Sequence, residues 1–266
     1  MMPERVDRLF RSVIEMPEGL VLTVGPTGSG KTSTLYTALG KRNSPTVKIV
    51  TAEDPVEYIL PGAQQVQVGE RHGIQFASAM RSFLRQDPDI ILVGEIRDND
   101  TLSTALQAGQ TGHLVLSTLH ANNSIDAIER MMELGAKPQT LRSALRAILA
   151  QRLVRVVCPH CAHPHRIIDP ESLDVLSRIG VDIVEEQVGA GCDECNGTGY
   201  RGRRAVYEML VFDKQARIAL SHGGLQELEQ AASRQRQYAP LLTAAVSLVH
   251  QGVTNMHEVQ RVVVDL

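Results

Sequence analysis

The chain has 266 residues, of which 43% are apolar and 3% aromatic, and its formal net charge is -3 at pH 7. This length allows one large domain and a smaller appendage. The slightly negative charge argues against nucleic acid as a partner, because nucleic-acid-binding chains present a basic field. No apolar run approaches the roughly 18 residues that span a bilayer, and the start of the sequence is too polar for a signal peptide. We therefore expect a cytoplasmic protein.

The first part of the sequence alternates between helical and strand-like patterns. An amphipathic helix is expected over residues 3–15, and further helices begin at Thr34 and occupy residues 76–86, 101–108 and 125–134. Strands are expected over residues 20–24, 47–51, 90–93 and 114–118, with a weaker edge strand at 65–68. Because nearly continuous apolar strands are typical of parallel sheets buried on both faces, the pattern predicts an α/β core with a parallel sheet.

A glycine-rich loop follows the first expected strand and matches the pattern GxxxxGK[ST]. It consists of Gly25, Pro26, Thr27, Gly28, Ser29, Gly30, Lys31 and Thr32. The glycines let backbone N–H groups turn toward phosphate oxygens, Lys31 supplies a cation for the outer phosphates, and the Thr32 hydroxyl is a ligand for Mg²⁺. A chance match in a glycine-rich turn is the alternative. The flanking strand and helix favour a P-loop that binds a nucleoside triphosphate.

The expected strand at residues 90–93 leads directly into Gly94 and Glu95. An acid at this place is typical of the strand that holds a carboxylate beside Mg²⁺ in P-loop enzymes. Here Gly94 replaces the first acid of the usual Asp–Glu pair, so Thr32 and Glu95 are expected to share the metal. A solvated glutamate at the end of a strand is the alternative.

Two further groups follow expected strands, and the carboxyl ends of parallel strands face the ligand crevice. The acidic loop of residues 53–57 contains Glu53, Asp54 and Glu57. We expect Glu53, or alternatively Glu95, to orient the attacking water. His120 follows the strand at residues 114–118 and is expected to sense or stabilise the γ-phosphate. A surface turn and a structural histidine are the respective alternatives.

Four cysteines form two CxxC pairs that are separated by 30 residues. The pairs are Cys158 with Cys161 and Cys192 with Cys195. Two such turns close a tetrahedral shell of four thiolates, so we predict a structural zinc site with a short helix, around residues 173–179, between the pairs. A redox pair and incidental free thiols are the alternatives.

A change in composition divides the sequence. Cys, His, Pro and Gly dominate after residue 154, and helical patterning returns from Asp213. We therefore predict an ATPase core over residues 1–154, a zinc-binding subdomain over 155–205 and a helical C-terminal subdomain over 206–266.

In this order, the motifs resemble those of the secretion ATPases of type II secretion and type IV pilus assembly. The resemblance rests on residues 25–32, 53–57, 84–98, 113–120 and 150–154. The glycine-rich segment around Cys192 and Cys195 also resembles the metal domain of the assembly ATPases, which retraction ATPases generally lack.

The resemblance implies a RecA-like P-loop ATPase with ATP, Mg²⁺ and Zn²⁺ as cofactors. It implies a homo-hexamer that powers pseudopilus or pilus assembly, with inner-membrane platform proteins and cytoplasmic adaptors as partners and peripheral attachment to the inner membrane. Family members carry N-terminal domains that the sequence does not contain, one of which supplies arginines to the nucleotide site. Arg81, Arg85 and Arg97 are either substitutes for them or structural ion-pair residues. A non-hydrolysing scaffold and a conjugation or retraction motor are the alternative functions.

Overall fold

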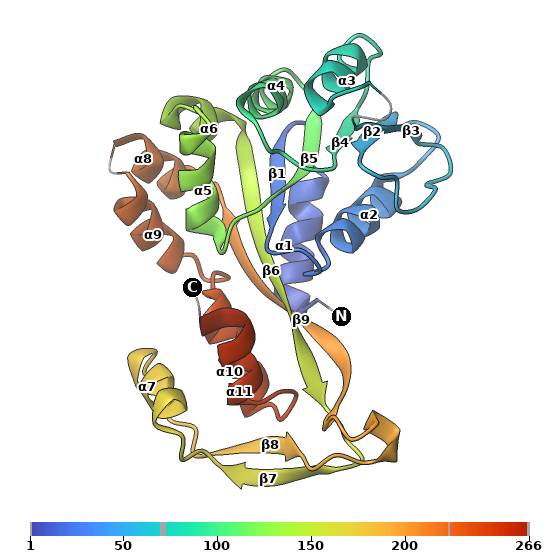
Figure 1. Ribbon diagram of the computed structural model, residues 1–266. Coiled ribbons are helices and arrows are strands. Elements are labelled where there is room, and N and C mark those ends of the chain that lie inside the picture. Colours follow the sequence, from blue (N-terminus) through green and yellow to red (C-terminus); the bar gives the residue numbers. More distant parts are fainter. Residues whose placement is uncertain (1, 70–72, 223, 265–266) are drawn as a thin grey trace. The chain divides into compact units, whose positions relative to one another are not determined.

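The computed structural model describes residues 2–69, 73–222 and 224–264 (Figure 1). These residues form two compact units. We call Met2–Ala150 with Met209–Tyr238 the sheet unit, and Gln151–Glu208 with the segment from Ala239 onward the cysteine unit. The units interleave along the chain, so the division into residues 1–154, 155–205 and 206–266 stays a prediction.

Seven strands of the described residues form one sheet in the order β3-β2-β4-β5-β1-β6-β9. Their bounds are Gln64–Gln67 (β3), Ile49–Glu53 (β2), Ile90–Val93 (β4), Leu114–Leu119 (β5), Gly19–Val24 (β1), Leu145–Val157 (β6) and Tyr200–Val211 (β9). Every neighbouring pair from β3 to β6 is parallel. Every residue of β1, β2, β4 and β5 is buried, as expected for strands that helices cover on both faces. The predicted parallel α/β core is confirmed.

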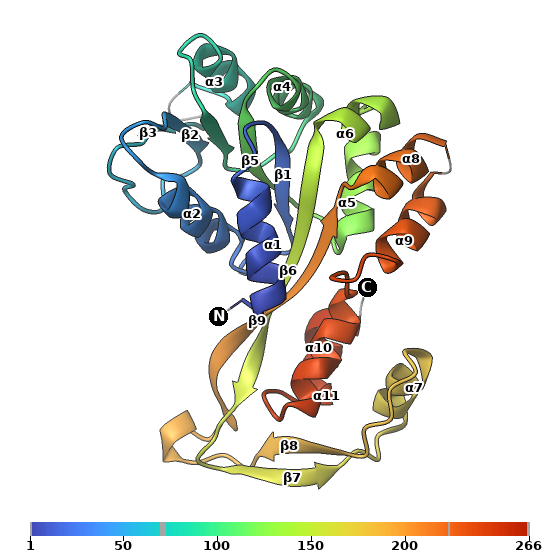
Figure 2. The same ribbon diagram turned by 180° about the vertical axis from the view of Figure 1, so that it is seen from behind.

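The helices of the sheet unit are α1 (Glu4–Ile14), α2 (Lys31–Arg42), α3 (Phe76–Phe83), α4 (Asn99–Gln110), α5 (Ser124–Glu133), α6 (Pro138–Ala144), α8 (Lys214–His222) and α9 (Leu225–Ser233). Helices α1 to α5 follow the expected pattern with small shifts at their ends, whereas α6 begins at Pro138, where only the end of the preceding helix was predicted. Helix α2 packs on β1 and β5, and α1 lies beside it, on the face of the sheet that is turned to the viewer in Figure 2. Side chains of Asp98 and Asn123 cap the first turns of α4 and α5.

The expected strand at residues 47–51 begins two residues later in the structure. Val47 lies in a turn, where its amide donates to the Ser44 carbonyl, and the Lys48 amide donates to the Asp89 carboxylate. Pairing with β4 therefore starts at Ile49. The shift places Glu53 as the last residue of β2 rather than in the loop beyond it.

The cysteine unit contains a two-stranded antiparallel sheet of β7 (Ala162–Arg166) and β8 (Glu185–Gly189). The helix α7 (Pro170–Arg178) connects these strands, at the place where a helix was predicted between the two CxxC pairs. Two further helices follow, α10 (Leu241–His250) and α11 (Met256–Val259). Among the described residues of the chain, no helix has both the length and the apolar character needed to cross a membrane.

Candidate functional site

The P-loop connects the end of β1 to the start of α2. Gly25, Gly28 and Gly30 have φ angles of 148°, 78° and 88°, a region that residues with a side chain seldom adopt. Helix α2 begins at Lys31, directly after Gly30. A run of positive-φ glycines before a helix N-terminus turns backbone N–H groups toward one point, so this turn has the form of an anion-binding nest.

The Lys31 side chain folds back over the P-loop. Its ammonium group donates to the carbonyl of Gly25 at 2.8 Å and to that of Pro26 at 2.9 Å. The charged end of the side chain therefore lies over the same turn as the converging amides, the position from which a lysine reaches phosphate oxygens.

Glu95 follows β4 and lies close to two of the other candidate residues. Its side chain is 14% exposed, one carboxylate oxygen contacts the Arg97 guanidinium, and the other is 3.7 Å from Nε2 of His120. The hydrogen bond to Glu95 raises the pKa of Arg97. Arg97 is thus an ion-pair residue of Glu95, the structural alternative considered above. The structure brings Glu95 and His120 together beyond the carboxyl ends of the neighbouring strands β4 and β5.

Glu53 is buried at the end of β2 and accepts three hydrogen bonds. Its carboxylate accepts from Tyr36 at 2.5 Å, from Thr51 at 2.5 Å and from Gln65 at 3.1 Å. Burial, and after it the hydrogen bond to Glu53, raise the pKa of Tyr36 to about 12. Strand β2, the P-loop helix α2 and the edge strand β3 therefore meet at this carboxylate.

The three donors to Glu53 were not predicted from the sequence. A partial signal exists for two of them, because Thr51 precedes Glu53 by two residues on one strand and therefore shares its face. Gln65 pairs with Thr51 in the parallel register of β2 and β3, but that register is known only once the edge strand has been placed. Tyr36 gives no local signal, since its contact with Glu53 depends on how α2 packs.

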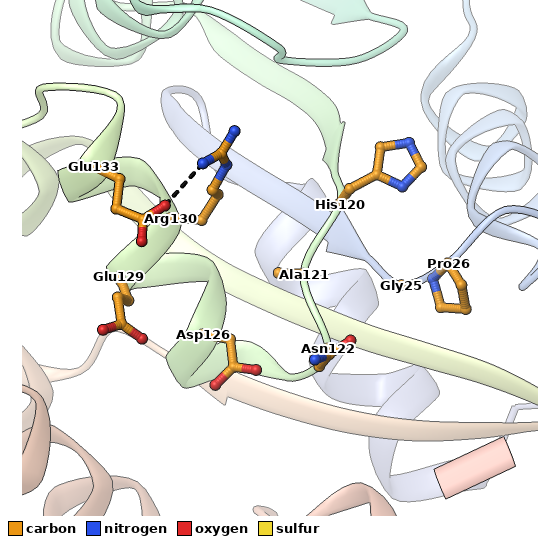
Figure 3. Close-up of a pocket in the computed structure, with 9 residues that line it drawn as sticks. All are labelled: Gly25, Pro26, His120, Ala121, Asn122, Asp126, Glu129, Arg130 and Glu133. Carbon is orange, nitrogen blue, oxygen red and sulfur yellow. Dashed lines mark hydrogen bonds and ion pairs between the residues drawn. The ribbon is translucent and has the colours of Figure 1, made fainter. Parts of the chain in front are cut away.

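A pocket of about 450 Å³ opens beside the start of the P-loop. Figure 3 shows Gly25, Pro26 and His120 on one side of it and side chains of α5 on the other. The α5 side chains are Asp126, Glu129, Arg130 and Glu133, with Arg130 paired to Glu133 at 2.8 Å. Carboxylates outnumber cations here, so the phosphates of a ligand are expected at the amide-lined turn rather than deeper in this pocket.

The four cysteines of the cysteine unit are brought together, as predicted. Their sulfur atoms all lie within 4.8 Å of one another. The measured pairs are 3.9 Å for Cys158 and Cys192, 3.9 Å for Cys161 and Cys195, and 3.8 Å for Cys192 and Cys195. A tetrahedral zinc with Zn–S bonds of about 2.3 Å requires sulfurs about 3.8 Å apart, so the donor set fits that metal.

Backbone amides support the second cysteine pair. The amides of Cys192 and Gly199 each donate to the Cys195 sulfur at 3.2 Å. The hydrogen bond from the Cys192 amide is the main cause that lowers the pKa of Cys195 to about 6, because an amide donor stabilises the negatively charged thiolate. The four cysteines therefore form a cluster suited to a metal ion.

Close backbone contacts explain the glycines around the second cysteine pair. A Cβ on Gly189 would lie 2.1 Å from the Gly199 carbonyl oxygen, and one on Gly191 would lie 2.7 Å from that of Gly197. Only glycine fits at such distances. The two sides of this loop approach each other closely, and that approach brings Cys192 and Cys195 to the other pair.

The chain is similar to curated proteins of two machines. The model of the type II/IV secretion system protein family matches residues 1–261. The type II secretion system protein E of Pseudomonas aeruginosa is 44% identical over 264 residues, which cover 98% of this chain and 52% of that protein. The type IV pilus assembly ATPase PilB of Thermus thermophilus is 44% identical over 255 residues, covering 94% of this chain and 28% of that protein. The chain spans about half the length of the type II secretion relatives it matches.

Solved structures show the same fold. The pilus retraction motor PilT with bound ADP aligns with a TM-score of 0.72 at 28% identity, covering 98% of this chain and 64% of that one. The ATPase DotB of Legionella pneumophila aligns with a TM-score of 0.71 at 23% identity, covering 98% of this chain and 63% of that one.

Proposed function

The chain belongs to the type II/IV secretion system protein family, and from this premise we propose that it is the ATP-hydrolysing motor core of a machine that assembles pseudopili or pili. The observation that carries the proposal is the P-loop of β1 and α2 with Glu95 at the end of β4. Two strands of one parallel sheet thereby supply the phosphate-binding turn and the carboxylate that ATP hydrolysis requires.

Each candidate residue has a distinct task in this proposal. The amides of residues 25–32 and the Lys31 ammonium bind the phosphates of ATP, and Thr32 and Glu95 hold Mg²⁺, which neutralises phosphate charge when bound. Glu53, in preference to Glu95, orients the attacking water. His120, 3.7 Å from Glu95, stabilises charge at the γ-phosphate.

We propose that the metal of the cysteine cluster is zinc and that its role is structural. Four thiolates fill a tetrahedral shell and leave no open position for substrate. The cluster also favours an assembly motor over a retraction motor, since its sequence resembles the metal domain of the assembly type. The names of the relatives at 44% identity, protein E and PilB, point to the same class.

The machine and its partners are proposed from family membership. We propose a homo-hexamer that works at the cytoplasmic side of the inner membrane and docks on platform and adaptor proteins. A second candidate is a non-hydrolysing nucleotide-binding scaffold.

Phosphate release by the purified chain separates the two candidates. A motor releases phosphate from Mg²⁺-ATP, and the rate per chain rises with protein concentration as rings form, a rise that native mass measurements follow in parallel. A scaffold binds ATP without releasing phosphate at any concentration. That second result, obtained on folded and zinc-loaded protein, would overturn the motor proposal.

A further inference from the structure

Among the residues that the structure describes, the hydrogen bonds at Glu53 leave one acceptor position open. Glu53 is buried, with 3% of the residue exposed. Thr51 and Gln65 both donate to Oε1, whereas Tyr36 donates to Oε2. A carboxylate oxygen accepts about two hydrogen bonds, so Oε1 is fully used and Oε2 keeps one free lone pair. The Tyr36 hydroxyl sets the direction of that lone pair.

The Tyr36 hydroxyl is itself held in place. The Gln65 side-chain nitrogen lies 3.2 Å from it while donating to the Tyr58 carbonyl at 2.9 Å, and the Tyr36 and Tyr58 rings pack edge to face with centroids 5.5 Å apart. The hydroxyl also lies 3.1 Å from the Tyr58 carbonyl. Because a hydroxyl has a single proton, the shorter contact of 2.5 Å to Glu53 takes it. Since burial and Glu53 raise the pKa of Tyr36 to about 12, the hydroxyl stays protonated at neutral pH.

Tyr36 also connects two parts of the nucleotide site. It lies on α2, the helix that begins at Lys31 of the P-loop, whereas Glu53 ends β2. A rigid contact between helix and strand fixes the carboxylate relative to the phosphate-binding turn, and misplacement by about 1 Å costs an enzyme on the order of a hundredfold in rate.

We propose that Tyr36 is a positioning residue for hydrolysis, whose hydroxyl aims the open lone pair of Glu53 at the attacking water. This inference rests on the proposed ATPase function and deepens it. In the step, the water oxygen bonds to the γ-phosphorus while the bond from that phosphorus to the bridging oxygen of ADP breaks. The electron pair of the broken bond leaves with ADP, and one water proton passes to Oε2 of Glu53.

The kinetic test is the change Tyr36→Phe, which removes the hydroxyl and keeps the ring. The expected result is a fall in kcat of about tenfold or more with KM for ATP within twofold, because Tyr36 aims the water acceptor and does not bind phosphate. Tyr58→Phe is the matched control. Its hydroxyl makes no hydrogen bond within the described part of the chain, so kcat should stay within twofold. Equal kcat in parent and Tyr36→Phe would overturn the inference.

A spectroscopic test needs no turnover. Ionisation of Tyr36 is followed by tyrosinate absorbance, with Tyr36→Phe identifying its contribution among the five tyrosines. Glu53→Gln removes a negative charge that raises the pKa of Tyr36, so the Tyr36 phenol should ionise at lower pH in that variant. An unchanged titration means that the two groups do not interact and contradicts the inference. A parent that lacks ATPase activity but shows the titration shift contradicts the proposed function instead, and with it the catalytic task of Glu53.

Discussion

The amide of Gly94 donates a hydrogen bond of 2.8 Å to the carbonyl of Ala52, and a Cβ at position 94 would lie 3.3 Å from the same oxygen. The same Cβ would also lie 3.4 Å from Cα of Glu53 and 3.4 Å from the Phe76 ring. Strand β2 thus passes so near to position 94 that a side chain there is crowded. This contact gives a physical reason why glycine replaces the acid that usually precedes Glu95.

Restoring that acid should therefore destabilise the sheet unit. We expect Gly94→Asp to cost about 1–3 kcal/mol, because β2 must shift to admit the side chain. Urea unfolding measures the change. Gly40→Ala is the control, since nothing lies within 4 Å of its Cβ and it sits in α2, where the exchange should stabilise by about 0.5–1 kcal/mol. Equal stability of Gly94→Asp and parent would show that position 94 is not crowded.

Much of the sheet unit was predictable because its strands are apolar on both faces and glycines or caps mark its helix ends. The long strands β6 and β9 were not predicted as strands. Their runs contain Arg146, Arg152 and Arg204, and these break both the apolar run and the alternation on which strand prediction depends. The proximity of the four cysteines followed from spacing, but the loop contacts that close the cluster did not.

The functional site, like the fold, was predictable from the sequence only in part. The P-loop and Glu95 were predicted because each lies within one strand and its following turn. The hydrogen bonds of Glu53 were not, since they join Tyr36, Thr51 and Gln65 across three elements. The sequence allows two roles for Arg97, a substitute arginine or an ion-pair residue, and only its side-chain placement against Glu95 favours the ion pair.

Substitution of Glu95 or Glu53 should lower the rate of ATP hydrolysis more than the affinity for ATP, unlike substitution of a residue that only binds ATP. We expect Glu95→Gln to keep ATP binding and to lose hydrolysis by at least about tenfold, because it removes charge at the metal and keeps the side-chain shape. Rapid-quench turnover together with ATP titration separates binding from chemistry. If Glu53→Gln loses hydrolysis while Glu95→Gln stays fully active, then Glu95 has a structural role and not a catalytic one.

The cysteine cluster should hold one zinc per chain. Elemental analysis of purified protein checks this, and X-ray absorption should give four sulfur ligands at about 2.3 Å. Chelation should increase hydrogen exchange over residues 158–204 and leave β1, β4 and β5 protected, because metal binding is coupled to local folding. Metal well below one equivalent, with four titratable thiols in the native protein, would reject the site.

Glu258 should make the cysteine unit sensitive to acid. Burial opposes its charge, but hydrogen bonds from Arg261 and Arg155 outweigh burial and lower the pKa of Glu258 to about 2. A carboxyl group with a depressed pKa stabilises the folded state above its ordinary value near 4.5 and loses that contribution as pH falls toward 2. We expect Glu258→Gln to cost on the order of 3 kcal/mol at pH 7 and to flatten the loss of stability between pH 4.5 and 2, as measured by denaturant unfolding. A parallel pH dependence in parent and variant would contradict this.

The most direct test of the central claim is calorimetric titration of Mg²⁺-ATP into the parent and into Lys31→Ala. The parent should bind one nucleotide per chain, and Lys31→Ala should lose measurable binding while keeping a cooperative unfolding transition, because Lys31 acts on phosphate charge at the P-loop and lies outside the core. Lys41→Ala is the matched control on the same helix. Its ammonium group pairs with Asp7 at 3.2 Å, away from the loop, so its affinity should equal that of the parent. Equal ATP affinity in all three proteins, or none in the parent, would contradict the assignment of residues 25–32 as the nucleotide site.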